Sequence, residues 1–145
     1  MTPRACCPPA RQAHPLLGPL PFSPLRCKYQ DCTIATAGVD KLVKVWDVRS
    51  PLKPLSVLRG HSYAVRRVQC SPHAPTVLLT CSYDMTLALW DWAAPENALL
   101  ARYGQHTEFA VGLDMSVHSE GLIASTGWDE MTYVWRAGTD PRAMP

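Results

Sequence analysis

A fixed interval of 45 residues constrains this chain more than any other feature. The interval separates three pairs of like residues: His61 and His106, Asp84 and Asp129, and Trp90 and Trp135. Self-similarity at a period of about 40–45 residues is typical of chains built from repeated structural units. The interval therefore predicts a repeat fold.

The units share four positions as well as a period. Two complete sets, with internal gaps of 19, 4 and 6 residues, are His61, Thr80, Asp84 and Trp90, then His106, Ser125, Asp129 and Trp135. An earlier unit keeps Thr36, Asp40 and Trp46 with the gaps of 4 and 6, and has Leu17 where the period would place the histidine. The sets resemble the tetrad of WD repeats, in which an indole N–H donates to a hydroxyl, the hydroxyl meets an imidazole, and the imidazole meets a turn aspartate. Each of these groups needs a partner when buried, and a satisfied chain of them rigidifies the unit.

Short apolar segments separated by turns, without a helical period, predict an all-β fold. The expected strands are 33–37, 42–47, 55–58, 64–70, 77–82, 86–92, 98–103, 109–115, 122–126 and 132–135. A Gly-His pair before such strands and a Trp-Asp pair near their end indicate the four-stranded antiparallel blade of a WD40-type β-propeller. We expect blades at about 26–59, 62–104 and 106–136, the first lacking most of its first strand and the third lacking its fourth.

The ends of the chain have a different composition. Residues 1–25 hold seven prolines, which oppose both helix and central strand, so we expect a disordered tail there, a partial propeller over 26–137 and a C-terminal tail over 138–145. The acid-free, arginine-bearing start leaves an organelle transit peptide as an alternative, which the prolines and single serine disfavour. No segment approaches the roughly 20 apolar residues of a membrane span, so direct membrane insertion is not expected.

Composition and spacing also disfavour several other classes of function. Residues 31–145 carry ten bases against twelve acids, unlike the clustered basic face of a nucleic-acid binder. A catalytic His-Ser-Asp set has no reason to recur every 45 residues, and no Gly-rich phosphate loop is present. The pairs Cys6-Cys7 and Cys27/Cys32 are not followed by a second pair at zinc-ligand spacing. We therefore expect a binding scaffold without enzymatic activity, metal or cofactor, whose thiols stay free in a reducing cytosol.

Residues that the generic repeat does not fix resemble the receptor for the type 2 peroxisomal targeting signal, the peroxin-7 family. The similar blocks are 27–47, 60–68, 81–84, 106–116 and 128–130. The resemblance implies the last three of seven blades, and hence a truncated form. It also implies a receptor that recognises the N-terminal type 2 signal of cargo proteins and delivers them for peroxisomal matrix import. Such a receptor works with an import co-receptor and docking proteins and cycles between the cytosol and the peroxisome.

In that family an amphipathic helical signal lies in a groove, with apolar anchors buried and basic residues meeting carboxylates. The residues beside the repeat turns that suit such a groove are Tyr63, Tyr83, Glu108, Phe109, Trp128 and Glu130. The alternative for each is an ordinary turn residue near the blade core.

Two alternatives remain open. Residues 34–49 end in Trp46-Asp47-Val48-Arg49, which resembles the box by which some WD-repeat substrate receptors dock onto cullin ubiquitin-ligase adaptors. The other alternative is a fragment without activity of its own, because open blade edges present unpaired backbone groups that can pair with another chain.

Overall fold

The regular structure of the chain consists of β-strands. A computed structural model describes residues 23–26, 32–94, 96–139 and 143–144, and these residues form no helix. The strands are β1 (Ser23–Arg26), β2 (Thr33–Ala37), β3 (Val43–Asp47), β4 (Ser56–Leu58), β5 (Val65–Cys70), β6 (Val77–Ser82), β7 (Leu87–Asp91), β8 (Leu99–Tyr103), β9 (Ala110–Met115), β10 (Leu122–Gly127), β11 (Thr132–Arg136) and β12 (Ala143–Met144). The predicted all-β class is confirmed.

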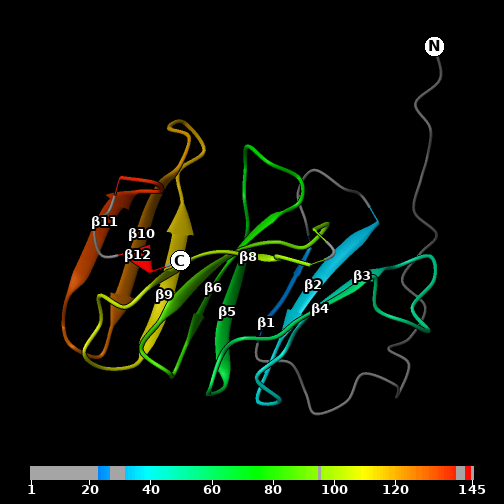
Figure 1. Ribbon diagram of the computed structural model, residues 1–145, viewed down its shortest axis with the longest axis horizontal. Helices are drawn as coiled ribbons and strands as arrows, with labels where there is room; N and C mark the ends of the chain where they lie inside the picture. The colour runs from blue at the N-terminus through cyan, green and yellow to red at the C-terminus, as the bar shows by residue number, and fades with distance from the viewer. Residues whose placement is uncertain (1–22, 27–31, 95, 140–142, 145) are drawn as a thin grey trace.

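Three antiparallel sheets stand side by side, one for each repeat (Figure 1). Their strand orders are β1-β2-β3-β4, β12-β8-β7-β6-β5 and β11-β10-β9. We call them the first, second and third blade in that order along the chain. Strand β5 contacts both β1 and β9, so the first strand of the second blade lies between those of its neighbours, as it does in WD40-type blades.

The structure corrects two expectations about the ends. Residues 23–25, assigned to the tail, belong to β1, which pairs with β2 and gives the first blade four strands. Pro24 is compatible with this strand because β1 is at a sheet edge, where one row of backbone donors has no ladder partner. Residues 143–144, also assigned to a tail, form β12 and pair with β8. Residues 1–22, 27–31, 140–142 and 145 lie outside the described residues, and with them Leu17, Cys6, Cys7 and Cys27.

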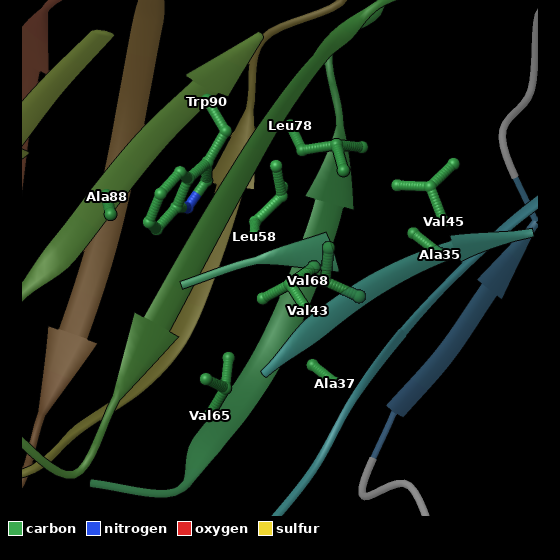
Figure 2. Packing of buried hydrophobic residues seen from close by; sticks show 10 residues of the cluster. All are labelled: Ala35, Ala37, Val43, Val45, Leu58, Val65, Val68, Leu78, Ala88 and Trp90. Carbon is green, nitrogen blue, oxygen red and sulfur yellow. The ribbon is translucent and has the colours of Figure 1, made fainter. Parts of the chain in front are cut away.

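Two apolar cores hold the three blades together. The core between the first and second blades includes Val43, Val65 and Trp90 (Figure 2). The core between the second and third includes Tyr103, Ile123 and Trp135. Each blade face is too thin to bury its side chains alone, so stability comes from stacking.

Strand β6 shows how the second blade serves both cores. Successive side chains of a strand point to opposite faces, and here Leu78 packs toward the first blade while Leu79 and Cys81 pack toward the third. All three are fully buried. Thr80 is on the same face as Leu78, so the polar set of the second blade faces the first blade.

The same alternation leaves the polar set of the first blade on an outer face. Ala35 and Val45 pack toward the second blade, so their neighbours Thr36 and Trp46 point the other way. Trp46 is accordingly half-buried, whereas Trp90 is 1% exposed.

Candidate functional site

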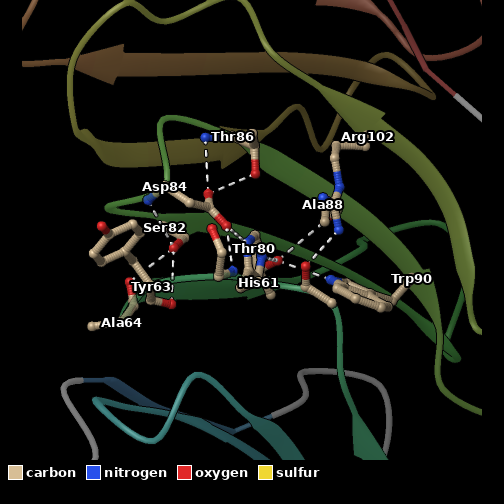
Figure 3. Close-up of polar contacts among 12 residues, drawn as sticks. His61, Tyr63, Ala64, Thr80, Ser82, Asp84, Thr86, Ala88, Trp90 and Arg102 are labelled. Carbon is tan, nitrogen blue, oxygen red and sulfur yellow. Dashed lines mark hydrogen bonds and ion pairs between the residues drawn. The ribbon is translucent and has the colours of Figure 1, made fainter.

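The four shared residues of the second blade form one continuous hydrogen-bonded chain (Figure 3). The Trp90 indole Nε1–H donates to the Thr80 hydroxyl oxygen at 2.8 Å. The same oxygen lies 2.8 Å from Nε2 of His61, and Nδ1 of His61 lies 2.8 Å from Oδ2 of Asp84. Strands β6 and β7 supply the hydroxyl and the indole, and the segment before β5 supplies the imidazole.

Hydrogen-bonding capacity assigns the protons in this chain. An ionised carboxylate only accepts, so Nδ1 of His61 carries the hydrogen that faces Asp84. In the neutral ring, Nε2 of His61 then accepts the hydrogen of the Thr80 hydroxyl. The Ala88 carbonyl oxygen, 3.2 Å from the same hydroxyl oxygen, is the other acceptor within reach of that hydrogen. His61 and Thr80 are buried and occupied at each polar atom. The set is built for rigidity and leaves no nucleophile free.

Asp84 connects this hydrogen-bonded set of side chains to the hairpin turn. It accepts hydrogen bonds from the backbone N–H of Ser62 at 3.0 Å and from the backbone and hydroxyl of Thr86 at 3.0 and 2.6 Å. Burial opposes ionisation of the carboxyl, but the hydrogen bonds from His61, Thr86 and Ser62 outweigh it and hold the pKa of Asp84 well below its ordinary value.

The third blade contains only part of the hydrogen-bonded set that the second blade has. Nε2 of His106 lies 2.8 Å from the Ser125 hydroxyl, and Nδ1 lies 2.9 Å from Oδ2 of Asp129. Burial again opposes ionisation of Asp129, yet the bonds from His106 and from two backbone N–H groups lower the pKa of this carboxyl. Trp135 does not join the set: its Nε1 is buried without a partner among the described residues.

Two sequence differences accompany this departure. Gln105 stands in place of Gly60, where an added Cβ would lie 2.8 Å from the Trp90 ring. Tyr133 stands one 45-residue step after Ala88, on the same face as Trp135. The Tyr133 ring packs edge-on against the His106 imidazole, with centroids 4.9 Å apart. In the second blade the equivalent imidazole, His61, packs against Trp90 instead. The Trp135 ring packs instead on Tyr103, with centroids 5.2 Å apart.

In the described part of the first blade, a lysine rather than an imidazole meets the turn aspartate. Nε1 of Trp46 donates to the Thr36 hydroxyl at 2.9 Å, as in the second blade. Asp40, however, pairs with the Lys44 ammonium at 2.6 Å. Lys44 occupies the repeat position of Ala88, so its side chain lies on the face where an imidazole would be needed.

The peptide-binding candidates lie beside the hairpin turns. We call the surface formed by residues 39–41, 62–64, 83–86, 107–109 and 128–131 the turn face. The structure brings three of the candidates into a row: the rings of Tyr83 and Phe109 are 5.0 Å apart, and those of Phe109 and Trp128 are 5.2 Å apart. Trp128 is 63% exposed and Tyr63 is 62% exposed, so both are open to contact.

The charged candidates lie close to this row in the sequence. Glu108 and Glu130 are exposed beside Phe109 and Trp128 in the third blade. Tyr63 lies under the ammonium of Lys41, whose Nζ is 5.8 Å from the ring centroid. Lys41 was missed by the sequence argument, because a lone turn lysine carries no signal until its position over an aromatic ring is known.

Other kinds of site find little support in the described part of the chain. It contains no cluster of three or more His, Cys, Asp or Glu side chains that could hold a metal ion. Among the described residues no helix is long and apolar enough to cross a membrane. The fully buried Cys81 has its pKa raised by desolvation to about 12, which makes it unreactive.

Comparison with known proteins connects the repeats and the non-repeat residues. Residues 52–91 match the family model described as WD domain, G-beta repeat. Peroxisome biogenesis protein 7 of Arabidopsis thaliana is 61% identical over 90 residues, 62% of this chain and 28% of that protein. The peroxisomal targeting signal 2 receptor of Dictyostelium discoideum is 49% identical over 74 residues, 51% of this chain and 23% of that protein. The receptor of that name in Saccharomyces cerevisiae is 30% identical over 142 residues, 74% of this chain and 38% of that protein.

These matches extend well beyond the tetrad positions. The chain spans 28% and 23% of the length of the Arabidopsis and Dictyostelium proteins. The chain carries WD40-type blades and is homologous, over part of its length, to proteins named peroxisomal targeting signal 2 receptor.

Proposed function

We propose that this chain is a binding scaffold that recognises the type 2 peroxisomal targeting signal of cargo proteins through its turn face. The observation that carries the proposal is the row of Tyr83, Phe109 and Trp128, which adjoins the exposed carboxylates of Glu108 and Glu130. An exposed aromatic row provides apolar contact area, and the carboxylates attract basic side chains. The names of the homologous proteins support the choice of ligand.

Binding on this surface fits the way in which the blades are built. The polar chains inside the second and third blades fix the turns from within, so the aromatic row is held in place before a ligand arrives. A preorganised surface loses less conformational entropy on binding than a mobile one. The turn residues therefore act in recognition, and the tetrad residues act in support.

The wider role follows from the same ligand. We propose that the chain acts in delivery of such cargo for peroxisomal matrix import, cycling between cytosol and peroxisome, with an import co-receptor and docking proteins as further partners. We also propose that it does so without catalysis, since the polar atoms of its His/Thr/Asp set are engaged in hydrogen bonds to one another.

A direct titration tests the proposal. The 145-residue chain is added to a fluorescent peptide carrying the type 2 signal, and to a scrambled peptide of the same composition, while anisotropy is recorded. Saturable binding of the first peptide above the second supports the proposal. Equal binding of both, with the blades folded by circular dichroism, would overturn it.

A matched pair of variants ties binding to the turn face. Trp128→Ala removes an exposed apolar side chain at the end of the row, and we expect it to weaken binding by about ten-fold or more. Val117→Ala removes an exposed apolar side chain beyond the opposite end of β9. We expect this control to leave binding unchanged.

A second candidate function rests on the segment after β3. Arg49 is 74% exposed at its side chain, and its guanidinium makes two hydrogen bonds to Asp47, at 2.8 and 3.1 Å, which fix its direction on the blade rim. An exposed, oriented arginine suits docking onto a cullin-ligase adaptor. A pull-down that recovers such an adaptor but no peroxisomal import factor, and that depends on Arg49, would favour this candidate.

A further inference from the structure

Three residues on the turn face have a backbone conformation that their side chains disfavour. Lys41, Met85 and Glu130 have φ angles of 65°, 66° and 61°, and they are the positive-φ non-glycine residues of the described chain. Each follows the turn aspartate of its blade: Asp40, Asp84 or Asp129. Glycine adopts this conformation without steric cost. The turn therefore accounts for the φ angles, but it does not account for the choice of three long side chains at equivalent positions.

The preceding aspartate holds each of these residues in place. Its carboxylate accepts a hydrogen bond from the backbone N–H two residues on: Leu42 at 3.3 Å, Thr86 at 3.0 Å and Met131 at 3.2 Å. The left-handed residue lies between the two bonded groups, so its Cα–Cβ direction is fixed by the same aspartate that meets Lys44, His61 or His106. The three side chains are exposed.

The three side chains differ in a spatially ordered way. The first blade presents the cation Lys41, the second presents the apolar Met85, and the third presents the anion Glu130. Glu108 adds a second exposed carboxylate on the third blade, and the aromatic row spans the second and third. The turn face is thus positive at one end, apolar in the middle and negative at the other.

From this order we infer that Lys41, Met85 and Glu130 are specificity-determining residues that set the direction in which an amphipathic helical peptide lies across the blades. The N-terminal end of the helix, which is the positive end of its dipole, lies over Glu130 and Glu108. The apolar face lies on Met85 and the aromatic row, and the negative C-terminal dipole end lies over Lys41. This inference rests on the proposed function and adds to it the direction in which the bound helix lies.

Opposite effects on stability and affinity distinguish this role from a purely structural one. Met85→Gly relieves the left-handed backbone, so we expect the melting temperature of the chain to rise or hold. The same change removes apolar contact, so we expect the affinity for the fluorescent type 2 signal peptide to fall about five-fold. Met85→Asn, which tolerates positive φ without an apolar side chain, should weaken binding similarly. Unchanged affinity in both variants would mean that Met85 touches no ligand.

Photo-crosslinking tests the direction itself. The type 2 signal peptide is made with a benzophenone group at its N-terminal or its C-terminal end and irradiated on the full chain, and labelled fragments are identified by mass spectrometry. We expect the N-terminal probe to label residues 106–136 and the C-terminal probe to label residues 33–58. In the double variant Lys41→Glu with Glu130→Lys, we expect this preference to be lost or reversed.

The outcomes separate the inference from the function on which it rests. Saturable binding with both probes labelling the same blades, or with the wild-type pattern kept in the double variant, overturns the direction and leaves the proposed function intact. A lack of saturable binding to the wild-type chain overturns both.

Discussion

The Lys44 ammonium lies 2.6 Å from the Asp40 carboxylate, and it takes the part that an imidazole takes in the next two blades. The lysine reaches the aspartate from the strand that follows the turn, whereas His61 reaches Asp84 from the segment before β5. Two different chain positions therefore provide the partner that a turn carboxylate needs.

The ion pair predicts a measurable role for Lys44 in the first blade. Lys44→Met keeps the length of the side chain but removes the cation, and among the described residues Asp40 then keeps the hydrogen bond from the Leu42 N–H at 3.3 Å. We expect a loss of about 1 kcal/mol in the free energy of unfolding, a modest value because both side chains are about one-quarter exposed. Urea denaturation measures it, with the exposed Lys53→Met as the matched control. An equal effect of the two substitutions would argue against the substitute role.

The Thr80 hydroxyl is expected to be worth more than its counterpart in the third blade. Thr80→Val leaves both the Trp90 indole N–H and Nε2 of His61 without their partner in a fully buried position. We expect a loss of about 3 kcal/mol. Ser125→Ala removes the partner of His106 alone, so we expect about 1–2 kcal/mol. Denaturant unfolding of the two variants measures both losses in free energy, and a larger loss for Ser125→Ala would contradict the prediction.

Most of the fold could be predicted because two independent signals agree. The spacing of the repeat locates the blades, and the alternation of apolar residues locates the strands within them. The predicted strand over 77–82 matches β6 at both ends. The strands that were missed carry too little signal: β1 contains a proline in four residues, and β12 has two residues. Pairing with β2 and β8, rather than local preference, makes them strands.

The spacing selects the residues of each polar set, and it predicts their contacts less well. The spacing selects Trp90 and Trp135 alike, yet only Trp90 donates to its hydroxyl. The difference is one of packing among side chains: Tyr133 stands in place of Ala88, and Gln105 stands in place of Gly60, which the Trp90 ring closely approaches. Sequence spacing does not encode such competition for one ring face.

The two tryptophans should therefore differ when each is replaced by phenylalanine. Trp90→Phe loses a hydrogen bond in addition to buried area, while Trp135→Phe removes a buried indole N–H that has no partner in the part of the chain that the structure describes. We expect the first change to cost about 1–2 kcal/mol more than the second. Thermal and urea unfolding of both variants measure the difference. Equal losses would indicate that the Trp135 N–H finds a partner in solution.

Acid should weaken the second blade through Asp84. The pKa of this carboxyl is lower in the folded chain than in the unfolded chain, so ionised Asp84 stabilises the fold above its unfolded pKa of about 4. That contribution is lost as the pH falls from about 5 through the lowered folded value. We expect the urea midpoint to fall steeply below pH 5, and less steeply in Asp84→Asn. Glu96→Gln, at an exposed position, should keep the wild-type slope.

Cys81 is predicted to report unfolding of the second and third blades. Its thiol is fully buried on β6 in their shared core, and desolvation raises its pKa to about 12. Only the thiolate reacts with alkylating reagents, so we expect no labelling by iodoacetamide at pH 8 in the native chain, and labelling in step with the urea transition. Cys32, which is only half-buried, is the internal control and should react in the native state. Mass spectrometry of peptides covering each cysteine reads out both sites. Native-state labelling of Cys81 at the rate of Cys32 would mean that the core around β6 opens without global unfolding.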